Sequence, residues 1–253
     1  MRSFKKDLLN VNIYDTRSEM GCAAAADIKA AILDMLKEKE TINMIFAAAP
    51  SQNEVLAALA NDKEIPWGRV NAFHMDEYIG LSKDAPQGFG NFLKEHIFGI
   101  APFGSVSYIR PDAASAEREA QRYSDLLAKN PTDIVVLGIG ENGHIAFNDP
   151  PVADFCDPKL IKKVQLDDIC RMQQVHDGCF PTFDDVPKYA LTLTVPALMS
   201  AEYLICTVPA STKANAVKAM LEGEYGEVCP ATALRKHKGA KMFLDKDSAQ
   251  KVL

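Results

Sequence analysis

The side chains best suited to chemistry lie between Asp133 and Pro151, in the stretch DIVVLGIGENGHIAFNDPP. An apolar run ends at Gly138 and Gly140, glycines that let a backbone approach a ligand closely, and we expect Gly140 to contact substrate in this way. Titratable and amide side chains follow within ten positions: Glu141, Asn142, His144, Asn148 and Asp149. A carboxylate bonded to one ring nitrogen of His144 would fix its tautomer and leave the other nitrogen for proton transfer. We therefore interpret this segment as part of an active site.

A second candidate for proton transfer is Asp76, in the stretch MDEYIGL at 75–81. It follows a strand rich in residues that are normally buried, and burial raises the pKa of a carboxyl group toward the range useful for a general base. The alternative interpretation is a helix or turn cap.

Ser51 and Lys213 form a candidate phosphate site. Ser51 lies between a predicted strand and a helix, where backbone N–H groups and the helix dipole favour an anion, and Lys213 lies near the start of another helix. The simpler alternative is that Ser51, or Asn53, only caps its helix while Lys213 is solvated.

The elements that must position these residues alternate between strands and helices. Apolar residues at helical spacing predict helices at 17–39, 88–98 and 115–129, and two further helices follow Asn53 and Ser211. Strands are predicted at 41–49 and 70–81 and in the segments SVSYIR, DIVVLGIG, AEYLICTV and AKMFLDKD. This alternation predicts one doubly wound α/β domain over 1–253, with a mostly parallel sheet covered on both faces. The carboxyl ends of parallel strands share one edge, so the candidate residues should meet in one crevice.

The longest stretch without a clear pattern is 149–189. A long ordered loop is usually functional, so we expect a lid within 150–189. The alternative is a peripheral segment that contains a short helix at 167–175.

Composition excludes several classes of protein. The formal net charge of −6 and the absence of a basic stripe argue against nucleic-acid binding. No apolar stretch resembles a signal peptide or is long enough to span a membrane. Six scattered cysteines favour reduced thiols and a cytoplasmic location. Cys170, His176 and Cys179 have no fourth ligand at a recognisable spacing, so no metal is predicted.

Four motifs carry a family resemblance: MDEYIGL, GIGENGHIAFNDP, VPKYALTL and the Ser-Thr-Lys helix start at 211–213. Over most of its length the chain resembles the glucosamine-6-phosphate deaminase/isomerase family. The resemblance implies a modified Rossmann-like α/β/α sandwich. It also implies conversion of an amino-sugar 6-phosphate, most simply glucosamine 6-phosphate, to fructose 6-phosphate and ammonia.

The resemblance also implies roles for individual residues. Asp76 matches the base that takes the proton from C2 and returns it at C1, and His144 matches the residue that opens the pyranose ring. Asn142 and Asp149 match the positions that orient this histidine, while Ser51 and Lys213 match phosphate ligands. No metal or organic cofactor is implied.

The chain departs from the family pattern at several of these positions. Asn142 stands where many members have an acid, and Asp149 stands where glutamate is usual. The phosphate loop reads AAAPSQNE instead of a glycine- and threonine-rich sequence. Arg171 is the nearest candidate for the phosphate-binding arginine of the lid, with Gln173, Gln174 and His176 as alternatives. These departures affect the identity of the sugar more than the type of reaction.

Two other functions stay open. One is hydrolysis of 6-phosphogluconolactone on the same fold. Lactonases, however, typically have Asp-Glu-Arg at the position where this chain has Asp76-Glu77-Tyr78, so the resemblance favours the deaminases. The other is a non-catalytic sugar-phosphate sensor, which would normally carry a DNA-binding segment; only about sixteen residues precede the first predicted helix here. The C-terminus is shorter than in hexameric, allosteric members, so we expect a monomer or a small homo-oligomer.

Overall fold

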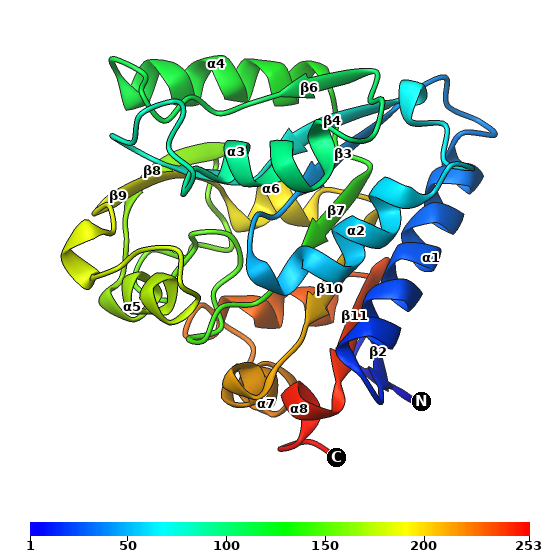
Figure 1. Ribbon diagram of the computed structural model, residues 1–253. Helices are drawn as coiled ribbons and strands as arrows, with labels where there is room; N and C mark the ends of the chain where they lie inside the picture. Colours follow the sequence, from blue (N-terminus) through cyan, green and yellow to red (C-terminus); the bar gives the residue numbers. More distant parts are fainter.

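An eight-stranded sheet runs through the centre of the computed structural model, which describes residues 1–253 (Figure 1). Its strand order is β1-β2-β11-β10-β7-β3-β4-β6, and all neighbours are parallel except the β1–β2 hairpin. The strands are β1 (Arg2–Lys6), β2 (Leu9–Tyr14), β3 (Ile42–Phe46), β4 (Val70–His74), β6 (Ser105–Ser107), β7 (Ile134–Leu137), β10 (Tyr203–Val208) and β11 (Ala240–Asp245). The predicted doubly wound, mostly parallel α/β fold is confirmed.

Helices cover both faces of this sheet because its central strands are apolar on both sides. In β7, Ile134 and Val136 join one hydrophobic cluster, while Val135 and Leu137 join another. The first cluster includes α1 (Arg17–Met35), α2 (Asn53–Asn61) and α3 (Phe89–Leu93), and the second includes α4 (Ala116–Lys129), α6 (Val195–Met199) and α7 (Ala214–Glu222). In Figure 1, α1 and α2 pack side by side on one face. A short helix, α8 (Lys246–Ala249), follows the last strand.

Local capping explains where two of the predicted helices begin. The Thr16 hydroxyl accepts the Glu19 N–H at 3.1 Å, and the Glu19 carboxylate accepts the Thr16 N–H at 3.1 Å, so α1 starts in a capping box at Arg17. The Ser115 hydroxyl caps α4 by accepting from the Arg118 N–H, without a reciprocal bond. The helix predicted at 88–98 is α3 followed by a π-helical turn at Lys94–Phe98.

The strand predicted over 70–81 was wrong in extent, because the chain leaves the central sheet at Met75. The Met75 N–H donates to the Phe46 carbonyl in the central sheet, and the Met75 carbonyl accepts the Leu193 N–H from a second sheet. This three-stranded antiparallel sheet has the order β5-β9-β8, with β5 (Asp76–Tyr78), β8 (Ile161–Gln165) and β9 (Tyr189–Leu193). Asp76 therefore lies at the junction of the two sheets.

Two segments contain more regular structure than their sequence indicated. Residues 149–189 hold β8 as well as the short helix, which is α5 (Asp168–His176). The N-terminal hairpin of β1 and β2 was not predicted, although Leu9, Val11 and Ile13 alternate as a half-buried strand should. None of the helices combines the length and apolar character that a membrane crossing requires.

Candidate active site

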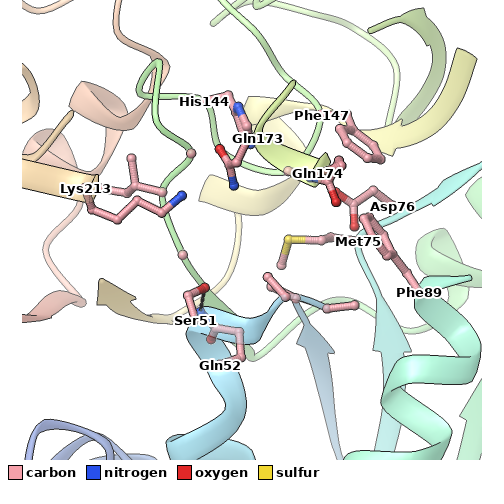
Figure 2. A pocket seen from close by; sticks show the side chains of 17 residues that line it. Ser51, Gln52, Met75, Asp76, Phe89, His144, Phe147, Gln173, Gln174 and Lys213 are labelled. Carbon is pink, nitrogen blue, oxygen red and sulfur yellow. Dashed lines mark hydrogen bonds between the residues drawn. The ribbon is translucent and has the colours of Figure 1, made fainter. Parts of the chain in front are cut away.

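A pocket opens where β4, β3, β7 and β10 end, and these four strands are neighbours in the sheet. It brings together five of the predicted site residues: Ser51, Asp76, Gly140, His144 and Lys213. Figure 2 shows Lys213 extending into the pocket from one side and Asp76 facing it from the other, with His144 on a third wall. Apolar side chains of Met75, Phe89 and Phe147 complete the wall near Asp76. The convergence of strand ends expected from the sequence is present in the structure.

Asn142 and Asp149 do not line the pocket but hold His144 from behind. His144 Nδ1 lies 2.7 Å from Asn142 Oδ1 and 3.0 Å from Asp149 Oδ1, and Asn142 Nδ2 donates to the same carboxylate oxygen at 3.0 Å. Since both neighbours of Nδ1 are acceptors, this nitrogen carries the proton and Nε2 is left as an acceptor. The shorter Asp149 thus reaches the histidine.

Gly140 is required by the position of the histidine ring. A Cβ atom on Gly140 would overlap the His144 imidazole, so only glycine lets the ring lie against this backbone. A Cβ on Gly138 would meet Gln52 Nε2 at 2.9 Å and Ser51 Oγ at 3.2 Å. The two glycines after β7 therefore make room for side chains on both sides of the pocket.

Asp76 has the environment of a strong base. It is buried, and burial together with the neighbouring Glu77 charge raises its pKa well above the ordinary value. The His74 ring fixes the backbone here, because its Nδ1 lies 2.9 Å from the Asp76 carbonyl and its Nε2 accepts the Ile109 N–H. Burial lowers the pKa of His74 to about 4, so this ring stays neutral and holds the carbonyl by donating from Nδ1.

Lys213 and Ser51 form the cationic end of the pocket. The Lys213 side chain is buried and makes no hydrogen bond or ion pair within the protein. Burial lowers its pKa, and the nearby Asp177 and Glu141 charges oppose this shift. The Ser51 hydroxyl accepts from Gln52 Nε2 at 3.1 Å, and Gln52 Oε1 accepts from the Thr207 hydroxyl at 3.0 Å. Neither Ser51 nor Asn53 caps α2 with its side chain, so the capping alternative is wrong.

Arg171 is not among the residues that line the pocket. Its guanidinium lies 3.9 Å from the centre of the Phe183 ring and donates to the Phe183 and Val186 carbonyls, both at 2.9 Å. Gln173 and Gln174 of the same helix line the pocket instead, as does Gln52. Gln52 was not predicted as a pocket residue because an amide next to Ser51 carries no distinctive signal in the sequence.

One group of side chains could share a metal ion: His144, Asp149 and Cys170 offer ligand atoms within 4.8 Å of one another. In this arrangement the His144 Nδ1 proton is used in hydrogen bonds, and burial raises the pKa of the Cys170 thiol well above its ordinary value. A cation bound through Nδ1 and the thiolate would have to displace both protons. The group fits a hydrogen-bonded network better than a metal centre.

Comparison with known proteins agrees with the fold and with the composition of this pocket. The model of the glucosamine-6-phosphate isomerases/6-phosphogluconolactonase family matches residues 15–243. The chain belongs to this family.

Individual relatives place it nearer to one branch. Glucosamine-6-phosphate deaminases of Bacillus cereus (strain B4264) and Bacillus thuringiensis (strain Al Hakam) are each 33% identical over 240 residues, which is 95% of this chain and 88% of the relative. The solved structure of a monomeric glucosamine-6-phosphate deaminase superposes with a TM-score of 0.85 at 28% identity, covering 95% of this chain and 99% of that one. A 6-phosphogluconolactonase from Thermotoga maritima, 21% identical with a TM-score of 0.76 and coverage of 93% and 99%, shares the fold.

Proposed function

We propose that this protein is an isomerising deaminase that converts an amino-sugar 6-phosphate, with glucosamine 6-phosphate as the first candidate, to a ketose 6-phosphate and ammonia. The observation that carries the proposal is that one pocket brings together a buried carboxyl group, Asp76, an oriented imidazole, His144, and an ammonium without an ion-pair partner, Lys213. The names of the 33% identical relatives support the same reaction.

The first step is ring opening. The Nε2 atom of His144 accepts the proton of the anomeric hydroxyl while the ring C–O bond breaks, and the Asp149 carboxylate stabilises the imidazolium that forms. The ring oxygen then takes this proton. Asn142 supplies a second acceptor for Nδ1 and fixes the carboxylate through its own Nδ2.

The second step is proton transfer between carbons. The Asp76 carboxylate removes the proton from C2 of the open-chain aldehyde while the C1 oxygen takes up a proton, which gives an enolamine across C1 and C2. Asp76 returns its proton to C1 and the nitrogen loses one proton, which balances the proton gained by the C1 oxygen. Water then converts the resulting imine at C2 to a ketone and ammonia. The raised pKa of Asp76 makes it a stronger base for this transfer, and neighbouring Phe89 and Phe147 limit water around it.

The phosphate group occupies the end of the pocket formed by Ser51 and Lys213, with amides of Gln52, Gln173 and Gln174 as neutral donors. Arg171 is not part of this proposal because its guanidinium is engaged elsewhere. We propose α5 as the lid, since Gln173 and Gln174 reach the pocket from it. The similarity to a monomeric deaminase favours a monomer. The cytoplasmic location stays a prediction.

Ammonia release from a panel of 2-amino-2-deoxyhexose 6-phosphates tests the function directly. We expect release from glucosamine 6-phosphate with formation of fructose 6-phosphate. Rapid hydrolysis of 6-phosphogluconolactone without ammonia release from any panel member would falsify the proposal in favour of the lactonase.

The Asp76→Asn variant tests the assigned base. It keeps the size of the side chain but cannot take a proton, so kcat should fall by about 10²–10⁴-fold while sugar-phosphate binding, measured by calorimetry, stays within about threefold. Unchanged turnover would remove Asp76 from the mechanism.

A further inference from the structure

The Asp149 carboxylate is held from two directions. Its Oδ1 accepts from Asn142 and lies against His144 Nδ1, as described above, while its Oδ2 accepts the backbone N–H of Asp167 at 3.2 Å. Asp167 is the residue that caps α5. The helix that carries Gln173 and Gln174 is therefore bonded directly to the carboxylate behind the histidine.

A third group lies close to this carboxylate. Cys170, in the first turn of α5, is fully buried. Its Sγ lies within 4.8 Å of a ring nitrogen of His144 and of a carboxylate oxygen of Asp149. Burial and the negative charges of Asp149 and Asp76 raise the pKa of the thiol well above its ordinary value. The thiol therefore stays protonated at neutral pH, and beside a carboxylate a protonated thiol is a hydrogen-bond donor.

The Oδ2 atom of Asp149 can accept a further hydrogen bond from the Cys170 thiol. A carboxylate oxygen accepts about two hydrogen bonds, and Oδ2 has one protein donor, the Asp167 N–H. A carboxylate bonded through both oxygens has a fixed plane, and the direction of Oδ1 toward His144 depends on that plane.

We propose that Cys170 is a positioning residue of the reaction: its S–H donates to the Asp149 carboxylate, so that α5 sets the orientation in which this carboxylate holds His144. The inference rests on the proposed role of His144 in ring opening. The competing explanation is that Cys170 only fills space in the hydrophobic cluster it shares with Tyr78 and Phe180.

A double-mutant cycle between Cys170 and Asp149 separates the two explanations. The Cys170→Ala variant should lower kcat by about fivefold to tenfold with KM within about twofold. In an Asp149→Asn background the same substitution should have less than about a twofold effect, because the carboxylate on which Cys170 acts is gone. An equal loss in both backgrounds means that the thiol only packs, and it overturns the inference.

Two further variants sharpen the cycle. Cys170→Ser keeps a donor and should recover most of the kcat lost in Cys170→Ala, whereas a serine variant as slow as the alanine variant would contradict donation. Cys179 lies just beyond α5 and is not part of the group formed by His144, Asp149 and Cys170, so Cys179→Ala is the matched control. Its kcat should stay within about twofold of the wild-type value. If Cys170→Ala is too unstable to purify, Cys170→Val, which fills the space without donating, replaces it.

A measurement without substrate keeps this inference separate from the proposed function. The exchange rate of the His144 Nδ1 proton with solvent, followed by NMR, should rise in Cys170→Ala and return toward the wild-type rate in Cys170→Ser. A rate that does not change overturns the inference whatever the enzyme's activity is. Failure of the wild-type protein to release ammonia, with the exchange result as expected, would count against the deaminase reaction alone.

Discussion

At the scale of single residues, His144 Nδ1 is held by one charged side chain, Asp149, and one neutral amide, Asn142. Asn142 Nδ2 donates to Asp149 Oδ1 at 3.0 Å, so the pair presents two oxygens to His144 Nδ1 without placing two like charges in contact. Two carboxylates at this separation would repel, and the pKa of one of them would rise. The amide at position 142 is therefore matched to the carboxylate at position 149.

Exchanging the two groups tests this division. Asn142→Asp should lower kcat at neutral pH because the Nδ2 donor is replaced by a second negative charge. Asp149→Asn should lower kcat by about 10²-fold because no charge stabilises the imidazolium. The double variant Asn142→Asp/Asp149→Asn restores one charge and one amide, so its kcat should return to within about tenfold of wild type. Steady-state ammonia release measures all three, and a double variant as slow as the product of the single losses would contradict the matching.

At the scale of elements, Glu77 connects the second sheet to a helix. It lies in β5 and is 1% exposed, and its carboxylate accepts the N–H groups of Tyr78, Phe89 and Gly90 at 2.9 to 3.0 Å. Two of these donors belong to the first turn of α3. Burial nevertheless raises the pKa of Glu77 to about 7, because the hydrogen bonds do not fully replace water.

This shift predicts how stability depends on pH. A carboxyl group whose folded pKa lies above its unfolded value stabilises the fold below the unfolded pKa, and the contribution is lost as pH rises through the folded pKa. Between pH 4.5 and about 7, wild type should lose up to about 3 kcal/mol of unfolding free energy relative to Glu77→Gln. Urea unfolding at pH 5 and pH 8 measures the difference, and the exposed Glu95→Gln is the control. Equal pH dependence of wild type and Glu77→Gln would refute the assignment.

At the scale of the whole molecule, the pocket draws on parts that are distant in the sequence. Ser51 follows β3, Asp76 begins β5, His144 follows β7 and Lys213 follows β10, while Gln174 comes from α5. A ligand that contacts all of them binds the folded chain and not the unfolded one, so binding stabilises the fold as a unit.

Thermal unfolding with ligand measures this coupling. At a concentration of about 100 Kd, an amino-sugar 6-phosphate should add about 2.7 kcal/mol and raise Tm by about 5–10 °C. Lys213→Met should lose most of this shift at the same concentration, because the ammonium for the phosphate is missing. Lys218→Met is the matched control, since Lys218 lies exposed on α7 and pairs only with Glu222. If Lys213→Met shows the same ligand-induced rise in Tm as wild type, Lys213 does not bind the phosphate.

The prediction from sequence succeeded where local patterns carry the information and failed where contacts between distant segments decide. The alternation of strands and helices in the central sheet and the meeting of strand ends follow from local periodicity and from the geometry of parallel sheets. The extent of the strand at 70–81 could not be read locally, because Met75 changes sheets through a bond to Leu193, more than a hundred residues away.

The amino-acid sequence by itself determined the α/β class, the family and the chemical types gathered at the strand ends, since these depend on residue identity and short-range spacing. Only the tertiary structure decided which side chains share the pocket. It directs Arg171 to Phe183, brings Gln52 and Gln174 into the pocket and places the Cys170 thiol near Asp149. The physical reason is that the face of a helix such as α5 that meets a ligand depends on how the whole helix packs, and its sequence fits more than one packing.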